Sequence, residues 1–242
     1  MTVSVCVNRL PTALDRALTA FQTAGFDACG ISFLDTCPID VALHPAVTEL
    51  DRYQHVIVTS PEAASQWVRA IEARWPQWPT GLTCWCVGEA TAAYLPNHAV
   101  RIRCAEAPGS EPLIDMMRDV LTPEARCLVV TAADAGRQFR VLEASLSVPL
   151  DWLELYRLVA VKPDNLRACC ACDYWVHGSA ALLKACLEAV SEDGVSLASV
   201  THCVTSDGAV ALLPSGSRYY RIAAPQPEYV RLALEGEPCV KA

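Results

Sequence analysis

Short apolar runs of strand length alternate with segments of helical periodicity along most of this chain. Runs such as Val56-Ile57-Val58 and Cys127-Leu128-Val129-Val130 are apolar at every position rather than at every second one. That pattern is typical of strands covered on both faces, which occur in parallel sheets flanked by helices. The sequence therefore predicts an α/β fold.

Ten segments have the length and apolar content of such strands: residues 3–7, 27–33, 55–58, 82–87, 100–104, 126–131, 150–155, 173–176, 200–204 and 219–222. Ten strands are many for one sheet in a chain of 242 residues, so we expect two five-stranded parallel sheets.

Two short segments that each contain a proline, residues 35–43 and 157–165, enclose the central five strands. We expect both segments to be crossings between domains. Residues 1–36 and 164–242 then form a discontinuous first domain, and residues 37–163 form an inserted second domain. A gap between two such domains is a common location for a small-molecule site.

Composition and charge exclude several classes of protein. The chain is 52% hydrophobic, which supplies a large core and excludes long disorder. Its 19 basic and 27 acidic residues give a net charge of −8, so a nucleic-acid partner is not expected. No apolar run approaches the ~18 residues that span a bilayer, and no signal-peptide pattern is present. We expect a cytoplasmic protein with no membrane partner.

The chain has 13 cysteines, an odd number, and without an export signal a disulfide framework is not expected. Cys84-Trp85-Cys86 and Cys169-Cys170-Ala171-Cys172 form two clusters, but neither has a partner pair with the spacing of a structural zinc site. The other cysteines lie mostly among Val, Leu and Ala, where cysteine packs as a small hydrophobe. We therefore favour core filling and expect no metal site. A metal or redox role for the clusters is the alternative.

Familiar catalytic motifs are absent from the sequence. Neither Gly-x-Gly-x-x-Gly, nor a phosphate-binding loop, nor Gly-x-Ser-x-Gly occurs. Of five histidines, only His177 stands at a suggestive place, directly after an apolar strand. We favour a strand-end histidine over a catalytic one.

Four predicted strands end in a small hydroxyl residue or a glycine that leads into a helix. They end at Val58-Thr59-Ser60-Pro61, Val87-Gly88-Glu89-Ala90-Thr91, Val176-His177-Gly178-Ser179 and Val204-Thr205-Ser206-Asp207-Gly208. Such ends direct free backbone N–H groups out of the carboxyl edge of a sheet, where open α/β sheets bind ligands. Ordinary helix capping explains each strand end taken alone, with Ser60 and Ser179 as the capping residues of their helices. Thr12 and Ser110 are expected to cap two other helices in the same way. The repetition of these strand ends indicates a site for a molecule with many carboxylates.

Five segments follow one another between residues 55 and 160: Val56-Ile57-Val58-Thr59-Ser60-Pro61-Glu62-Ala63, Cys86-Val87-Gly88-Glu89-Ala90-Thr91-Ala92, Gly109-Ser110-Glu111-Pro112-Leu113, Leu128-Val129-Val130 through Gly136-Arg137 to Leu146, and Leu153-Glu154-Leu155-Tyr156-Arg157. In order and spacing they resemble the uroporphyrinogen-III synthase family. Weaker similarities lie at Val7-Asn8-Arg9-Leu10-Pro11 and Ser179-Ala180-Ala181.

Three segments depart from the family pattern. Thr131-Ala132-Ala133-Asp134-Ala135 stands where the family has a glycine-rich stretch. His177-Gly178-Ser179 replaces a Thr-Ser-Pro element, and Thr205-Ser206-Asp207-Gly208 replaces a Gly-Pro-Thr-Thr turn. The departures at residues 177–179 and 205–208 both lie in the first domain. They weaken the prediction of that domain's binding residues more than they weaken the prediction of the fold.

The resemblance implies two flavodoxin-like α/β domains joined by a two-stranded linker. It implies a cyclising hydro-lyase of heme and porphyrin biosynthesis, which converts hydroxymethylbilane to uroporphyrinogen III with loss of water and inversion of ring D in the interdomain cleft. No redox or nucleotide cofactor is implied. The tetrapyrrole substrate is expected to pass over from the preceding pathway enzyme, and the chain is expected to be a monomer.

The resemblance also suggests which residues act. Tyr156, where a strand meets a crossing segment, is the candidate general acid because a phenol stays protonated at neutral pH. Packing under the linker is its alternative role. The candidate substrate-binding residues are Arg9, Thr59, Ser60, Gly88, Thr91, Arg137 and Ser179. The substrate carries eight carboxylates, so helix-start amides and the two arginines must outweigh the repulsion from a chain of net charge −8.

Two other classes of protein remain open. The first is a non-catalytic, two-lobed tetrapyrrole or small-acid binding or regulatory protein on the same scaffold, which the departures at residues 205–208 favour. The second is a cysteine-based metal-handling protein, which would contain stoichiometric zinc or iron.

Overall fold

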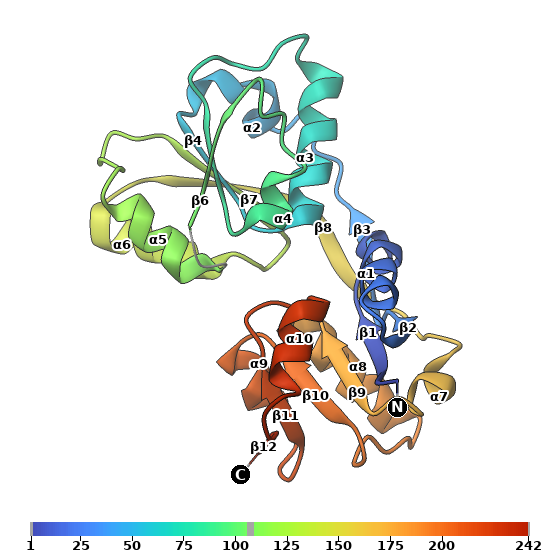
Figure 1. Ribbon diagram of the computed structural model, residues 1–242. Coiled ribbons are helices and arrows are strands. Elements are labelled where there is room, and N and C mark those ends of the chain that lie inside the picture. The colour runs from blue at the N-terminus through green and yellow to red at the C-terminus, as the bar shows by residue number, and fades with distance from the viewer. Residues whose placement is uncertain (1, 106–108, 242) are drawn as a thin grey trace. The chain divides into compact units, whose positions relative to one another are not determined.

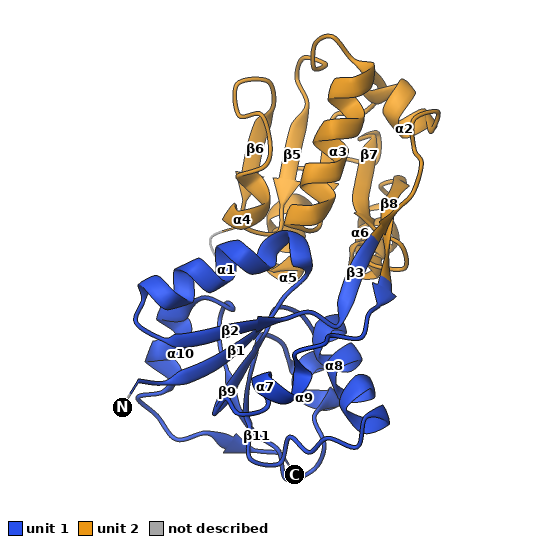
Figure 2. Ribbon diagram, turned by 90° about the vertical axis from the view of Figure 1, so that its right-hand side faces the viewer, with its two compact units in different colours: residues 1–36, 159–242 blue, residues 37–158 orange. Residues whose placement is uncertain are grey.

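A computed structural model describes residues 2–105 and 109–241, and the chain forms two compact units (Figure 2). Unit 1 comprises residues 1–36 and 159–242, and unit 2 comprises residues 37–158. The described residues form two mostly parallel six-stranded sheets flanked by helices (Figure 1). The predicted α/β class with two sheets is confirmed.

The helices and strands have the following bounds. Unit 1 contains β1 (Ser4–Asn8), α1 (Pro11–Thr23), β2 (Asp27–Ile31), α7 (Leu166–Cys169), β9 (Tyr174–His177), α8 (Ala180–Glu192), β10 (Thr201–Val204), α9 (Asp207–Leu212), β11 (Arg218–Arg221), α10 (Pro227–Ala233) and β12 (Cys239–Val240). Unit 2 contains α2 (Pro45–Thr48), a 3₁₀ turn η1 (Leu50–Arg52), β4 (His55–Val58), α3 (Pro61–Arg74), β5 (Thr83–Cys86), α4 (Glu89–Ala92), β6 (Arg101–Cys104), α5 (Ser110–Arg118), β7 (Cys127–Ala132), a 3₁₀ turn η2 (Arg137–Phe139) and α6 (Arg140–Leu146). β3 (Leu34–Pro38) and β8 (Leu150–Ala160) each run across a boundary between the units and are neighbours in a sheet.

The sheet of unit 2 is covered on both faces, as its apolar runs predict. Its strand order is β3-β8-β7-β4-β5-β6, and the pairs from β8 to β6 are parallel. Because successive residues of a strand point to opposite faces, Val56 packs in one core with Trp67 of α3. Ile57 packs in a second core with Leu113 of α5 and Leu142 of α6.

The sheet of unit 1 has strand order β12-β11-β10-β9-β1-β2 and is parallel except for the edge pair β11–β12. Val5 and Val7 pack with Phe21 of α1 and Val230 of α10. Cys6, between the two valines, faces the opposite side and packs there with residues of α7 and α8. Both faces of this sheet are therefore buried.

The two sheets share one strand arrangement in permuted chain order. Counted from β4, unit 2 has the order 3-2-1-4-5 for its five parallel strands. In unit 1, strands β9, β10, β11, β1 and β2 are numbered 1 to 5 in that sequence. With this numbering, its five parallel strands also have the order 3-2-1-4-5. In doubly wound folds of this kind the ligand lies where the strand order reverses, beyond the carboxyl ends of the strands. That switch point lies between β4 and β7 in unit 2 and between β9 and β1 in unit 1.

Four local expectations need correction. β3 and β12 were not among the ten predicted strands, because β3 contains Asp35 and Pro38 and β12 has only two residues. Ser60 and Ser179 cap α3 and α8 as predicted. Thr12 and Ser110 do not cap their helices, because Leu10 and Gly109 are the N-cap residues of α1 and α5.

Among the residues that the structure describes, no helix combines the length and apolar character needed to cross a bilayer.

Candidate functional site

The switch point of unit 2 brings two threonines together. β4 and β7 are adjacent and parallel, so Thr59 and Thr131 lie at the same carboxyl edge. The Thr59 hydroxyl donates toward Thr131 Oγ1 at 3.0 Å and the Val130 carbonyl oxygen at 3.2 Å. Gly136 closes over this pair with a φ of +73°, and a Cβ there would lie 3.2 Å from Thr131 Oγ1. Both the positive φ and the close approach favour glycine.

Tyr156 lies one strand further along this edge, on β8. Its side chain is only 4% exposed, and its hydroxyl lies 3.1 Å from Ser60 Oγ. Ser60 Oγ also accepts the Ala63 backbone N–H at 3.0 Å, which caps α3. Burial raises the pKa of Tyr156, the charge of Glu62 raises it further, and the Ser60 hydrogen bond opposes both. The tyrosine is therefore a neutral hydrogen-bond donor over the physiological pH range.

Hydrogen bonds bring two further helix starts to the same edge. Val87 N donates to Val58 O at 3.4 Å, and Gly109 N donates to Val87 O at 2.8 Å. Gly88, the N-cap residue of α4, thus lies beside the end of β4. The Gln138 side chain donates to Ser110 Oγ at 2.8 Å, which ties the Arg137 turn to the start of α5.

The edge of unit 2 therefore gathers five predicted site residues, which are Thr59, Ser60, Gly88, Arg137 and Tyr156. Arg137 is exposed and pairs with Asp134 at 3.0 Å, so its charge is partly neutralised. The sixth predicted residue of this unit, Thr91, lies within α4 and is only 2% exposed. Its side chain is part of the interior of unit 2.

In unit 1 the switch point holds Arg9 and Ser179. Arg9 follows β1, and Gly178 and Ser179 follow β9, which pairs with β1. A Cβ on Gly178 would lie 2.6 Å from Arg9 Cδ, so glycine leaves the space that the arginine side chain fills. Arg9 Nη2 donates to the Pro225 carbonyl at 3.0 Å, and burial lowers the Arg9 pKa. The guanidinium is thus fixed at this edge.

His177 ends β9 and lies in a buried polar chain. Asn8 Nδ2 donates to the Leu182 carbonyl at 3.0 Å and lies 3.1 Å from His177 Nδ1. His177 Nε2 lies 3.1 Å from Nδ1 of His202, and both rings are almost fully buried. The structure thus places His177 as a hydrogen-bonded histidine in the interior of the sheet.

A cavity of about 450 Å³ in unit 1 is lined in part by His202 but lies away from Arg9 and Ser179. It is lined by residues 196–198 and 214–217, which precede β10 and β11. Those segments lie at the amino edge of the sheet, opposite the switch point. None of the predicted site residues lines this cavity.

Thr131 is a polar residue of this edge that the sequence prediction did not select as a site residue. Its side chain is fully buried, although threonine is mostly exposed in proteins. The available signal was its place at the end of an apolar run, the same signal that selected Thr59. Only the strand order shows that these two positions are adjacent.

Replacing Ser60 with alanine is expected to lower the free energy of unfolding by about 2 kcal/mol, since it removes a helix cap and leaves the buried Tyr156 hydroxyl without its partner. Ser179→Ala, which removes a cap in unit 1, is the matched control with an expected loss of about 1 kcal/mol. Urea denaturation of both variants tests this difference. Equal losses would show that the Ser60–Tyr156 hydrogen bond does not contribute.

Comparison with known proteins agrees with this architecture. The family model described as "Uroporphyrinogen-III synthase HemD" matches residues 15–213. The solved uroporphyrinogen-III synthetase from Helicobacter pylori 26695 has a TM-score of 0.57 and 13% identity, covering 97% of this chain and 99% of that one. A mutant uroporphyrinogen III synthase from Thermus thermophilus has a TM-score of 0.55 and 14% identity, covering 88% of each chain. These two likenesses concern the fold, whereas the family match spans most of the sequence. The chain belongs to the uroporphyrinogen-III synthase family.

Proposed function

We propose that this protein converts hydroxymethylbilane to uroporphyrinogen III, with loss of water and inversion of ring D. Family membership supports lyase-type cyclisation as the class of reaction. The single observation that carries the finer proposal is the buried Tyr156 hydroxyl, held 3.1 Å from Ser60 beside the switch point of unit 2. It provides a proton donor at the edge where a doubly wound sheet binds its ligand.

In this proposal Tyr156 donates its proton to the departing hydroxyl group of the substrate. The carbon–oxygen bond breaks, water leaves, and the resulting azafulvene cation closes through a spiro intermediate that inverts ring D. The proton that ring closure releases from the pyrrole carbon returns to the Tyr156 oxygen. Because the linear substrate also cyclises unaided to the uninverted isomer, the protein must mainly hold the chain in one geometry and keep water away from the reactive centre. These tasks need no redox or nucleotide cofactor.

Local positive potential is needed to bind eight carboxylates to a chain of net charge −8. The first turns of α3 and α8, of 14 and 13 residues, present the positive end of a helix dipole, and Ser60 and Ser179 each accept one N–H group there. Arg9 and Arg137 add formal charge at the same carboxyl edges. Acidic groups on distant faces are screened over a Debye length of ~8 Å at physiological salt. We propose that each unit thereby binds part of the substrate.

The experiment supplies the purified chain with freshly prepared hydroxymethylbilane and no added cofactor, then separates the type I and type III isomers. We expect type III uroporphyrinogen in excess over a control without protein. Formation of type I alone, at the spontaneous rate, would reject the synthase activity. Tight binding of the substrate in that case would instead support the non-catalytic tetrapyrrole-binding protein, which the departures at residues 205–208 favour.

A further inference from the structure

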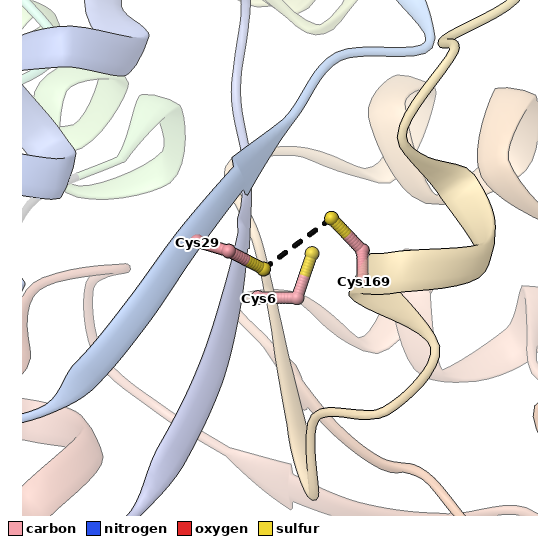
Figure 3. A group of neighbouring side chains, drawn as sticks. All are labelled: Cys6, Cys29 and Cys169. Atoms are coloured by element: carbon pink, nitrogen blue, oxygen red, sulfur yellow. Dashed lines mark hydrogen bonds between the residues drawn. The ribbon is translucent and has the colours of Figure 1, made fainter.

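Three sulfur atoms from distant segments of unit 1 meet on one face of its sheet. Cys6 lies on β1, Cys29 on β2 and Cys169 at the end of α7 (Figure 3). Their three Sγ atoms lie within 4.8 Å of one another, and Cys29 Sγ lies 3.3 Å from Cys169 Sγ. Cys6 and Cys169 are fully buried, whereas Cys29 is half-buried. Cysteines that only fill a core as small hydrophobic side chains do not need to place their sulfur atoms next to one another, as these three do.

Backbone structure holds the three positions together. Cys6 and Cys29 are opposite each other in the parallel pair β1–β2, so their side chains lie on the same face. α7 packs on this face, where the Asn165 side chain donates to the Gly30 carbonyl at 2.8 Å. Trp175 Nε1 donates to the Cys169 carbonyl at 3.2 Å. The sulfur atoms therefore belong to a fixed scaffold rather than to a loose loop.

A fourth cysteine, Cys172, lies beside Cys29 at the margin of this group. Cys172 follows Cys169 by three residues, and its backbone N–H donates to the Cys169 carbonyl at 3.1 Å. Its Sγ lies 3.5 Å from Cys29 Sγ. Cys169 and Cys172 thus have the Cys-x₂-Cys spacing of structural zinc sites, and the second pair comes from neighbouring strands instead of a second local motif.

We propose that Cys6, Cys29, Cys169 and Cys172 bind one Zn²⁺ ion as a structural site of unit 1. Tetrahedral zinc with Zn–S bonds of about 2.3 Å places sulfur atoms about 3.8 Å apart, close to the 3.3 Å and 3.5 Å that separate Cys29 Sγ from Cys169 Sγ and Cys172 Sγ. Cys172 lies outside the group of three sulfur atoms within 4.8 Å of one another, so its side chain must turn toward Cys6 and Cys169 when the ion binds. Binding releases the four thiol protons to solvent, since thiolates are the ligands. Zn²⁺ suits this donor set because soft sulfur ligands in tetrahedral geometry favour it, and no oxidant or reductant is required.

Such an ion would join β1, β2 and the α7 turn, which are far apart in the sequence. The half-buried Cys29 and Cys172 provide the side from which the ion enters, while Cys6 and Cys169 close the inner side. The site is separate from Tyr156 and its neighbours, which belong to unit 2. The proposal therefore does not depend on the synthase activity.

The test uses the full chain, reduced, freed of metal and kept without oxygen. Zn²⁺ is titrated in competition with a chromophoric chelator, and Co²⁺ is added separately as a spectroscopic probe. We expect one equivalent of Zn²⁺ per chain, and a Co²⁺ spectrum with intense thiolate-to-metal charge transfer and tetrahedral d–d bands. Cys29→Ala and Cys172→Ala are expected to weaken Zn²⁺ binding by at least about 100-fold, since even outer-shell changes cost roughly 10- to 100-fold.

Two other cysteines provide matched controls. Cys203→Ala removes a buried thiol from β10 of the same sheet, and Cys170→Ala removes one from between Cys169 and Cys172. Both variants are expected to keep the affinity of the unaltered chain. Circular dichroism checks that each variant is folded. If a variant does not fold, the Co²⁺ spectrum of the unaltered chain still shows whether thiolates bind the metal.

Three results would overturn the proposal. The first is a reduced, unaltered chain that binds neither ion at micromolar concentration. The second is unchanged Zn²⁺ affinity in Cys29→Ala or Cys172→Ala. The third is a Cys29–Cys169 or Cys29–Cys172 disulfide, found by mass spectrometry, that re-forms in air even with excess Zn²⁺ present.

Discussion

Lowering the pH from 7.5 to 5 is expected to destabilise unit 1 by about 2 kcal/mol through His202 alone, with a further loss through His177. Burial lowers the pKa of His202 to about 4. Burial also lowers the pKa of His177 well below its usual value, and the neighbouring His202 adds to this effect. Both rings are neutral in the folded chain at physiological pH.

The hydrogen bonds explain why neither ring accepts a proton. The Asn8 amide nitrogen donates to the Leu182 carbonyl, which fixes the orientation of that amide. The same nitrogen faces His177 Nδ1, so Nδ1 accepts and Nε2 carries the proton that His177 donates to His202 Nδ1. An added proton on either Nδ1 would face another N–H group. The chain Asn8–His177–His202 is therefore stable only in its neutral form.

The sign of the effect follows from the order of the pKa values. Unfolded histidines titrate near 6.5, and the folded His202 titrates near 4. Between these values the unfolded chain binds more protons, so stability is complete above pH 6.5 and is lost as the pH falls toward 4. At about 1.4 kcal/mol per pKa unit, the full contribution of His202 is about 3 kcal/mol.

Urea denaturation at pH 7.5, 6 and 5, followed by circular dichroism, measures this loss. His202→Gln removes one of the two titrating rings and should reduce the pH dependence by about 2 kcal/mol at pH 5. His98→Gln is the control, since it removes a histidine at an exposed position in unit 2 without altering the buried histidines. Equal stability of the unaltered chain at pH 7.5 and 5 would contradict the neutral histidine chain.

Local patterns in the sequence predicted most helices and strands of the fold, but they did not predict which strands pair with one another. Residues 55–58 were predicted as a strand because they are apolar on both faces, and they form β4. Ser60 and Ser179 were predicted as caps because each separates a strand from a helical pattern. The same argument failed at Thr12 and Ser110, where Pro11 and Gly109 shift the helix start by one residue or more.

Contacts between distant segments escaped prediction because they depend on strand order. Thr59 and Thr131 are 72 residues apart, and Cys29 and Cys169 are 140 apart. No spacing rule joins such residues until β4 is known to pair with β7, and α7 to pack against β2. The cysteine cluster in particular combines one local pair with one cross-strand pair, so a search for two local pairs does not find it.

Tyr156→Phe is expected to slow formation of the type III isomer by about 10²- to 10⁴-fold while leaving the chain folded, which is the range that general-acid catalysis contributes. Phenylalanine fills the same buried space on β8 but has no proton to donate and no hydrogen bond to Ser60. Loss of that bond should lower the free energy of unfolding by only about 1 kcal/mol. The effect on rate should therefore far exceed the effect on stability.

The measurement is the initial rate of type III formation at saturating hydroxymethylbilane, since the spontaneous reaction gives only type I. Tyr53→Phe is the matched control, because Tyr53 also belongs to unit 2 and donates a hydrogen bond, to Asp151 at 2.8 Å, but precedes β4 at the opposite edge of the sheet. It should keep the full rate. Because the pKa of Tyr156 is raised, the unaltered enzyme should also lose no activity through this residue below about pH 10. A Tyr156→Phe enzyme with unchanged kcat would show that the tyrosine only supports the packing of β8, and that the proton for the departing hydroxyl comes from another donor.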